Sequence, residues 1–270
     1  MHKPLIAVLG GGNMGFSLIG GIIANGLPSH CITVADPSKT QLHALEHRFE
    51  VKVTQDNLKA IQDADVIILA VKPQVLLSVL NELLTLILRN KPLVISIAAG
   101  ISIASLENII PQCPIIRAMP NTPALISSGA SGLYANSFVS QAQKELAESI
   151  IRSVGLVVWV EDEKLIDVIT ALSGSGPAYI FLMMEYMAKA AVALGLNQDA
   201  AKLLAMQTAY GAARMALESA DSLADLRKKV TSPGGTTQAA IHAFEAQDFE
   251  KVIANAMQAA FERSQALAQG

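Results

Sequence analysis

The fold is decided by the stretch Pro4-Leu-Ile-Ala-Val-Leu-Gly-Gly-Gly-Asn-Met-Gly15. Its apolar first half predicts a β-strand buried on both faces, and residues 13–24 have the pattern of a helix. The glycines at the junction fit the pattern G-x-G-x-x-G. Gly10 permits a tight turn, Gly12 lets the backbone approach a pyrophosphate, and Gly15 lets helix and strand pack closely. We therefore predict a dinucleotide site, with a tight turn that binds nothing as the alternative. The residues expected to contact the dinucleotide here are Leu9, Gly10, Gly12, Asn13, Met14 and Gly15.

Short apolar segments alternate with helix-sized segments through the first half of the chain. Further strands are expected at residues 32–36, 66–71 and 93–97, with later ones near 115–116 and 157–160, and helices at 41–49 and 75–88. Parallel strands need crossover connections of this length, so the sheet should be mostly parallel and connected in a right-handed sense. We expect the sheet to end near Glu161.

The second half of the chain has a different character. Residues 162–270 are almost all compatible with helix, and residues 178–194 are apolar nearly all round, which predicts a helix buried inside an assembly. Gly195 is a suitable stop for that helix, and Asn197 is a suitable cap for the next. The predicted fold is α/β, with a Rossmann-type, NAD(P)-binding parallel-sheet domain over residues 1–161 and an all-α domain over residues 162–270.

The composition of the 270-residue chain restricts its partners. It is 51% hydrophobic, 16% charged and 4% aromatic, with a formal net charge of -3. Scattered cations and scarce aromatic residues argue against a nucleic-acid partner. The uncharged stretches 4–35 and 118–143 are interrupted by glycine, proline and asparagine, so we predict no membrane span. Cys31 and Cys113 lack metal or redox spacing and are expected to be buried thiols in the cytoplasm. The surplus of apolar residues indicates a subunit interface.

Asp36 and the residues after it bear on the choice of cofactor. Asp36 lies about 20 residues after Gly15, at the end of the second predicted strand, where an acid would bind the ribose hydroxyls of NAD. Ser38 and Lys39 follow and are suited to the additional phosphate of NADP. These signals conflict, and a turn with a helix start explains the same residues. We expect NADP (NADPH) to be preferred, with NAD (NADH) as the alternative.

Further segments go beyond a general cofactor fold. They are Ala70-Val-Lys-Pro73, Arg117-Ala-Met-Pro-Asn-Thr-Pro123, Leu172-Ser-Gly-Ser-Gly-Pro-Ala-Tyr179 and Ser232-Pro-Gly-Gly-Thr-Thr237. In this order and at these distances they resemble pyrroline-5-carboxylate reductase, and the resemblance runs over nearly the whole chain. It implies NAD(P)H-dependent reduction of 1-pyrroline-5-carboxylate to L-proline, the last step of proline biosynthesis.

The resemblance also implies a path for the cofactor along the carboxyl ends of the strands, where ligands of open α/β sheets lie. Asn57 is expected near the adenosine, and small residues after the fourth strand are expected to let the ring approach. Lys72 has a second interpretation, that of a solvated lysine before a turn. The cofactor-binding residues implied by the resemblance are Asn57, Ala70, Val71, Lys72, Pro73, Ala98, Ala99, Met119, Pro120, Asn121 and Thr122.

The segment from Ser232 to Thr237 is the predicted substrate site. Gly234 and Gly235 should expose backbone N–H groups where a helix begins, a combination that suits a carboxylate. By resemblance, the substrate carboxylate lies around Gly235 and Thr236, and the hydroxyl of Thr237, the expected catalytic group, meets the ring nitrogen. An ordinary helix cap is the alternative. The expected substrate-binding residues are Ser232, Gly234, Gly235, Thr236 and Thr237.

Three other features are assigned no chemistry. His43 and His47 share a helix face but lack a further ligand, so we predict no metal site. Arg227-Lys228-Lys229 is interpreted as a solvated face, with attraction of an anionic substrate as the alternative. Residues 173–177 do not fit G-x-S-x-G, because Ser173 stands where glycine is needed, and we expect them to support the site structurally.

The mechanism expected from these residues needs no metal or covalent nucleophile. A protonated cyclic imine is already electrophilic, so orientation, exclusion of water and a proton from Thr237 or water are sufficient. A β-hydroxyacid dehydrogenase would need lysine and asparagine where Ile180 and Met183 stand. A regulator that only binds the cofactor would not need residues 232–237. The resemblance further implies a homodimer with interlocked C-terminal helices, and assembly of five dimers into a decamer.

Overall fold

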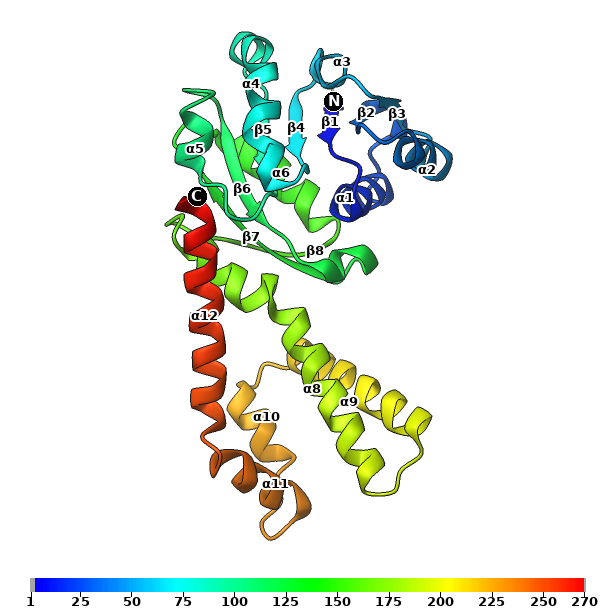
Figure 1. The fold of residues 1–270 in the computed structure, drawn as a ribbon, viewed down its shortest axis with the longest axis vertical. Helices are drawn as coiled ribbons and strands as arrows, with labels where there is room; N and C mark the ends of the chain where they lie inside the picture. The colour runs from blue at the N-terminus through cyan, green and yellow to red at the C-terminus, as the bar shows by residue number, and fades with distance from the viewer. Residues whose placement is uncertain (1–2, 270) are drawn as a thin grey trace. The chain divides into compact units, whose positions relative to one another are not determined.

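The computed structural model describes residues 3–269 and is drawn in Figure 1. The described residues form two compact units. The first, called the sheet unit, consists of the chain up to Ser175 together with the residues from Ala260 onward. The second, called the helical unit, is Gly176–Ala259. The chain therefore leaves the sheet unit once and returns to it at its C-terminal end.

Within the described residues, the sheet unit contains one eight-stranded sheet with the order β3-β2-β1-β4-β5-β6-β7-β8. Neighbouring strands are parallel except for β6 and β7, which are antiparallel. Chain order reverses at β1, which has β2 on one side and β4 on the other. The strands are β1 Ile6–Leu9, β2 Ile32–Ala35, β3 Lys52–Thr54, β4 Val66–Leu69, β5 Leu93–Ser96, β6 Ile115–Met119, β7 Gly129–Ala135 and β8 Gly155–Trp159.

Helices cover both faces of this sheet (Figure 1). One face packs against α1 Asn13–Ala24, α2 Lys39–Phe49 and α6 Gln141–Arg152. The other face packs against α3 Asn57–Ile61, α4 Pro73–Asn90 and α5 Ile103–Glu107. Strands such as β4, with the sequence Val-Ile-Ile-Leu, are fully buried, as expected for a strand covered on both sides. The remaining elements of this unit are η1 Ser29–Cys31, η2 Thr122–Ile126, α7 Leu165–Ile169 and the π-helical turn η3 Thr170–Gly174.

The helical unit contains α8 Gly176–Ala193, α9 Gln198–Glu218, α10 Leu223–Lys229, α11 Thr236–Glu245 and the first part of α12 Phe249–Gln269. As predicted, α8 ends before Gly195 and Asn197 caps α9, where its side chain accepts from the backbone N–H groups of Asp199 and Ala200. Among the described residues of α8 none is buried, although the helix is almost wholly apolar. An apolar helix that its own chain leaves largely exposed fits the expected burial in an assembly.

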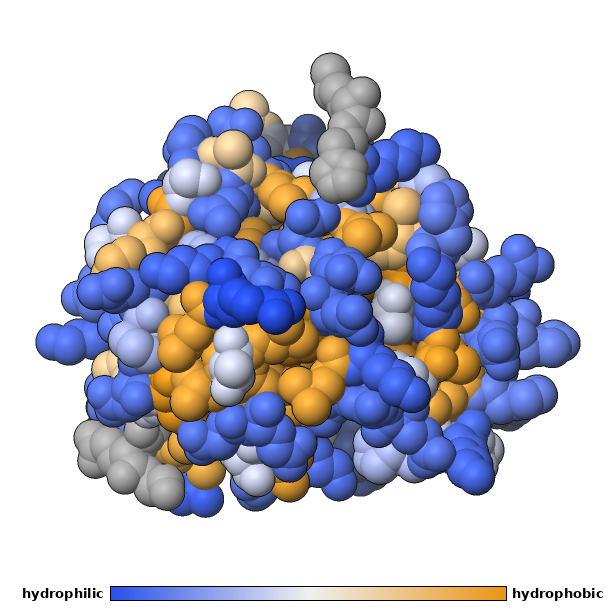
Figure 2. Space-filling model, turned by 90° about the horizontal axis from the view of Figure 1, so that it is seen from above, coloured by the Kyte–Doolittle hydropathy of each residue, from blue (hydrophilic) through white to orange (hydrophobic). Residues whose placement is uncertain are grey.

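The predicted fold class is confirmed: a mostly parallel Rossmann-type sheet is followed by a helical region. The expected strands at 32–36, 66–71 and 93–97 are β2, β4 and β5. Two strands, β3 and β7, were not predicted. The expected domain boundary at residues 161 and 162 lies before the boundary between the compact units, because α7 and η3 pack with the sheet unit. Figure 2 views the molecule from above and shows apolar patches separated by hydrophilic residues on that surface.

Candidate active site

The glycine loop between β1 and α1 lies tightly against the end of β4. Gly10 has a φ of +103°, and a Cβ there would lie 2.6 Å from the backbone oxygen of Ala70. A Cβ on Gly15 would lie 2.3 Å from the backbone oxygen of Gly10. Both positions therefore exclude any larger residue, for the reasons expected from the sequence. Gly12 is different, because a Cβ there would meet nothing within 4 Å.

The open side of Gly12 is where a phosphate would lie. Gly12 is the N-cap of α1, and no side chain caps that helix. The N–H groups of its first turn are free to bind an anion, and the helix dipole favours negative charge at the same point. The loop therefore fits the pyrophosphate of a dinucleotide, with Asn13 and Met14 in the first turn.

Asp36 fastens the loop to the neighbouring strand. One carboxylate oxygen accepts a hydrogen bond from the N–H of Gly11 at 2.8 Å, and the other accepts one from the N–H of Ser38 at 2.8 Å. The side chain of Ser38 in turn caps α2 by accepting from the N–H of Gln41 at 3.3 Å. Lys39 is exposed beside them. The segment is thus a turn and helix start placed beside the loop, and its contact with a ribose or an additional phosphate stays a prediction.

Gln41 is a further part of this arrangement that the sequence analysis missed. Its side-chain amide donates to the carbonyl oxygen of Gly11. The backbone N–H and C=O of Gly11 are therefore both hydrogen-bonded by side chains of the segment from Asp36 to Gln41. A Cβ on Gly11 would lie 2.6 Å from Cδ1 of Leu45, which closes that side of the loop. The sequence did contain a signal for this role. Gln41 is polar and uncharged and lies in the first turn of α2, the helix that begins shortly after Asp36.

The other predicted cofactor residues follow the ends of adjacent strands. The ends of β1, β4, β5 and β6 are in register, with Leu9 beside Leu69 and Ser96 between Leu69 and Arg117. Asn57 follows β3 at the far end of the same edge, as the first residue of α3. The segments brought to this edge are Leu9–Gly15, Ala70–Pro73, Ala98–Ala99 and Met119–Thr122. Because the order of strands reverses between β1 and β4, this edge is where an open α/β sheet binds its ligand.

Asn121 has a role that the sequence did not predict. Its amide group donates to the backbone oxygen of Ser173 at 2.9 Å, and its carbonyl group accepts from the N–H of Ala130 at 2.9 Å. A Cβ on Gly174 would lie 2.7 Å from the methyl group of Met119. The segment around residues 173 and 174 therefore supports the end of β6, and the side chain of Asn121 serves that support.

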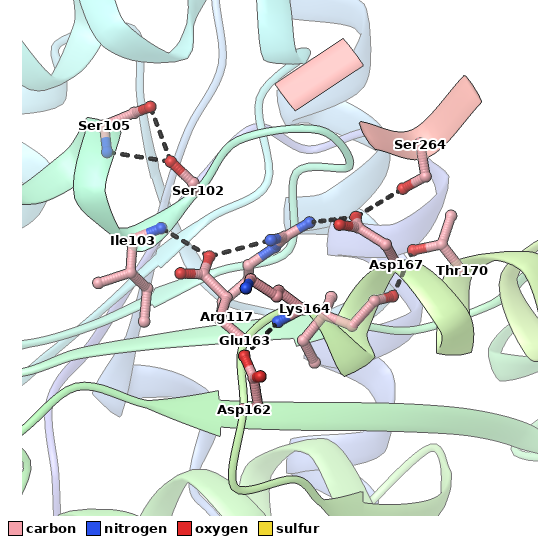
Figure 3. A network of polar contacts seen from close by, with 11 residues as sticks. Ser102, Ile103, Ser105, Arg117, Asp162, Glu163, Lys164, Asp167, Thr170 and Ser264 are labelled. Atoms are coloured by element: carbon pink, nitrogen blue, oxygen red, sulfur yellow. Dashed lines mark hydrogen bonds and ion pairs between the residues drawn. The ribbon is translucent and has the colours of Figure 1, made fainter. Parts of the chain in front are cut away.

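A buried ionic network lies beside the same strand ends (Figure 3). The guanidinium of Arg117, with a side chain only 4% exposed, binds Glu163 at 2.9 Å and Asp167 at 3.3 Å. Glu163 also accepts from the backbone N–H of Ile103 at 2.8 Å, and Asp167 accepts from the hydroxyl of Ser264 at 2.8 Å. Burial of a charged group is tolerated only with such partners. Arg117 begins one of the segments that carry the family resemblance, residues 117–123, but its partners were not predicted from the sequence.

The predicted substrate segment lies in the helical unit, between α10 and α11. Gly235 is the N-cap of α11 and supplies no side-chain cap, so the first turn of the helix can accept an anion. One expectation is corrected here: the N–H groups of Gly234 and Gly235 do not face outward. The first donates to the side-chain oxygen of Gln238 at 2.7 Å, and the second donates to the backbone oxygen of Ser232 at 3.0 Å. Thr237, in that first turn, is half-buried.

The remaining features offer no further site. The described residues contain no group of three or more histidine, cysteine or acidic side chains that could hold a metal ion. The rings of His43 and His47 stack with centroids 6.3 Å apart on α2. Lys229 and Lys228 form ion pairs with Asp221 and Asp225, which agrees with a solvated face.

Comparison with known proteins identifies the family. Residues 163–267 match the family described as pyrroline-5-carboxylate reductase dimerisation. A pyrroline-5-carboxylate reductase of Pseudomonas aeruginosa is 48% identical over 100% of this chain and 98% of that protein. The chain belongs to the pyrroline-5-carboxylate reductase family. It is an NAD(P)-dependent oxidoreductase, as predicted from the sequence.

Solved structures of pyrroline-5-carboxylate reductases share the whole fold. The enzyme from Coxiella burnetii is 46% identical, covers 99% of both chains and superposes with a TM-score of 0.96. The enzyme from Plasmodium falciparum, solved with NADP bound, is 31% identical, covers 99% of both chains and has a TM-score of 0.87. Residues 5–100 also match a family described as NADP oxidoreductase coenzyme F420-dependent, which covers the glycine loop and β1 to β5.

The family match also bears on the apolar helices that follow the sheet. By length and composition alone, the helical stretch Leu165–Ala193 could cross a membrane, and little of it is buried within the chain. The same stretch falls in the region matched by the dimerisation family. The family match therefore supports oligomerisation through this region.

Proposed function

We propose that this chain reduces 1-pyrroline-5-carboxylate to L-proline with NADPH, as the last step of proline biosynthesis. The observation that carries the proposal is the joint presence of a dinucleotide loop in the sheet unit and an uncapped helix start at Gly235 in the helical unit. The first fits a pyrophosphate and the second fits a carboxylate. Close similarity to named pyrroline-5-carboxylate reductases over the whole chain supports the choice of substrate.

The cofactor supplies a hydride, which adds to the imine carbon, the ring carbon that is doubly bonded to nitrogen. The ring nitrogen takes up the electron pair of the C=N bond and ends as an amine carrying a proton. The chain orients the ring and excludes water, and the hydroxyl of Thr237 binds the ring nitrogen and stabilises its proton. The carboxylate of the substrate lies on the N–H groups at the start of α11, chiefly those of Thr236 and Thr237, because the two preceding N–H groups are bound within the loop.

Preference for NADPH follows from the surroundings of Asp36. Two backbone N–H groups already bind its carboxylate oxygens, which leaves fewer acceptor positions for ribose hydroxyls. The hydroxyl of Ser38 accepts from Gln41 but can still donate, and Lys39 is exposed beside it. A hydroxyl donor and a cation suit the additional phosphate of NADP. The NADP-bound structure of the Plasmodium falciparum enzyme supports the same assignment.

The working form is a homodimer, with assembly of five dimers into a decamer. The exposed apolar residues of α8 and α9 support the dimer, since they include Phe181 and Tyr210, which are 61% and 59% exposed in one chain. Residues 162–270 form the substrate and dimerisation domain of this proposal, supported by the family match over 163–267. The buried free thiols of Cys31 and Cys113 support a cytoplasmic location.

A set of threonine variants tests the proposed role of Thr237. Thr237→Val removes the hydroxyl with little change of volume, Thr237→Ser keeps it, and Thr236→Val is the matched control one residue away. We expect kcat/KM for 1-pyrroline-5-carboxylate to fall about 100-fold in Thr237→Val and only slightly in Thr237→Ser. The Kd of NADPH should not change in any of them. A Thr237→Val enzyme with wild-type kcat/KM would contradict the role.

A further inference from the structure

The loop that follows β5 is held by the C-terminal end of the chain. This loop, residues 97–102, contains Ala98 and Ala99, which the family resemblance implies as cofactor-binding residues where a ring of the cofactor approaches. Gly100 has a φ of +72°, and a Cβ there would lie 2.9 Å from Cβ of Leu267, in the last turns of α12. A left-handed residue at this contact favours glycine, and glycine also lets the helix approach the loop backbone.

The far end of the loop is held by the ionic network. The backbone N–H of Ile103, which opens α5, donates to the carboxylate of Glu163 at 2.8 Å. Glu163 is bound in turn by Arg117, whose guanidinium also reaches Asp167. Figure 3 shows Arg117 from β6, Glu163 from the segment before α7 and Asp167 from α7 meeting close to Ser264 of α12.

A buried hydroxyl joins the end of α12 to that network. Ser264 is 4% exposed and donates to the same oxygen of Asp167 that receives Arg117. Two carboxylates share one guanidinium here, so the hydroxyl provides a hydrogen bond that Asp167 needs in a buried position. Both ends of the loop are therefore connected to one cluster of charges, directly at Ile103 and through α12 at Gly100.

We propose that the C-terminal turns of α12 are a positioning element of the cofactor site, with Ser264 as the positioning residue that acts on the 97–102 loop through Leu267 and the Arg117 network. This rests on the proposed function, because it assumes that Ala98 and Ala99 line the nicotinamide. Ser264 itself touches neither cofactor nor substrate. Loss of its hydroxyl releases the end of α12, the loop gains freedom, and the nicotinamide end of the cofactor binds less tightly.

The test compares Ser264→Ala with Ser264→Thr, which keeps the hydroxyl, and with Ser140→Ala. The last removes a capping hydroxyl from α6, which destabilises the fold without touching the loop. Kd of NADPH is measured by fluorescence titration, and KM of both substrates, kcat and Tm are measured on the full-length enzyme. We expect Ser264→Ala to raise Kd and KM for NADPH about fivefold, with KM for 1-pyrroline-5-carboxylate unchanged. Ser264→Thr should restore them, and Ser140→Ala should lower Tm alone.

A fall in Tm for Ser264→Ala with an unchanged Kd of NADPH would overturn the proposal, since that is what a merely structural hydroxyl gives. If Ser264→Ala does not fold, Leu267→Gly decides, because it removes the Cβ that faces Gly100, and Leu267 is half exposed, so no buried polar group is left unpaired. A raised Kd of NADPH in Leu267→Gly supports the positioning role, and an unchanged Kd refutes it. The titration needs no turnover, so failure of the wild type to reduce the imine would refute the proposed function separately.

Discussion

Replacement of Gly12 by alanine separates binding of the cofactor from folding. A Cβ at this position meets nothing within 4 Å, and the φ of -65° is open to any residue. As an N-cap, alanine is less favourable than glycine by about 1 kcal/mol at most, which lowers Tm by about 2–4 °C in a chain of this size. The added methyl group lies where the pyrophosphate approaches the backbone. Loss of charge-assisted hydrogen bonds to phosphate, about 1.5–3 kcal/mol, raises the Kd of NADPH about 10- to 100-fold.

Gly15→Ala is the matched comparison. A Cβ there would lie 2.3 Å from the oxygen of Gly10, whereas real Cβ contacts stay beyond 3.0 Å, so helix and loop must separate by at least 0.7 Å (3.0 minus 2.3). That overpacking costs about 1–3 kcal/mol of folding stability, with loss of affinity as a consequence. Fluorescence titration of NADPH and thermal unfolding measure both variants. Gly12→Ala protein that binds NADPH with the wild-type Kd would show that the pyrophosphate does not lie over Gly12.

Three further outcomes follow from the contacts of single residues. The hydroxyl of Ser96 is fully buried and has no hydrogen-bond partner among the described residues. Ser96→Ala should therefore leave the free energy of unfolding, measured in urea, within about 1 kcal/mol of wild type or raise it. A decrease of more than about 2 kcal/mol would show that the hydroxyl has a hydrogen-bond partner, such as a bound water. Hydrogen bonds from Arg152, and next from Trp159, hold the pKa of Glu148 below its usual value. The stabilising contribution of that carboxylate is therefore present above the unfolded pKa and lost as pH falls through the lower folded pKa. The fluorescence of Trp159, the only tryptophan, should change as pH falls below the ordinary range of a glutamate pKa, and this change should be absent in Glu148→Gln. Burial raises the pKa of the Cys113 thiol, so peptide mapping after treatment of the native enzyme with a thiol reagent should find Cys113 unmodified, and rapid labelling would mean that the core around it opens.

Local patterns in the sequence were sufficient for the parts of the fold that depend on neighbouring residues. The glycine spacing predicted the turn at Gly10 and the close packing at Gly15, and Asn197 predicted the start of α9, since each of these acts within one turn of chain. The strand β7 was missed because Gly129–Ala135 is rich in glycine, alanine and serine, which are poor strand formers. Pairing with β6 and β8 on either side makes it a strand all the same.

Contacts between distant parts of the chain were beyond what the sequence could predict. Arg117 pairs with residues about 50 positions later, and Ser264 joins them from near the C-terminal end of the chain. No local pattern in the sequence therefore predicts this network. Asn121 was expected at the cofactor, and the hydrogen bond from its side chain to the backbone oxygen of Ser173 could not be predicted from the sequence. The segment from Ser232 to Thr237 was predicted to be an anion site, but only the geometry of its turn shows which of its N–H groups are bound within the loop.

The most direct test of the account is a stoichiometric assay of the purified wild-type enzyme with 1-pyrroline-5-carboxylate. Oxidation of NADPH is followed by absorbance, NADH is tested in parallel, and L-proline is quantified at the end point. We predict one L-proline formed for each NADPH oxidised, with a higher kcat/KM for NADPH than for NADH. A folded protein that binds either cofactor tightly but forms no L-proline with NADPH or NADH would contradict the account.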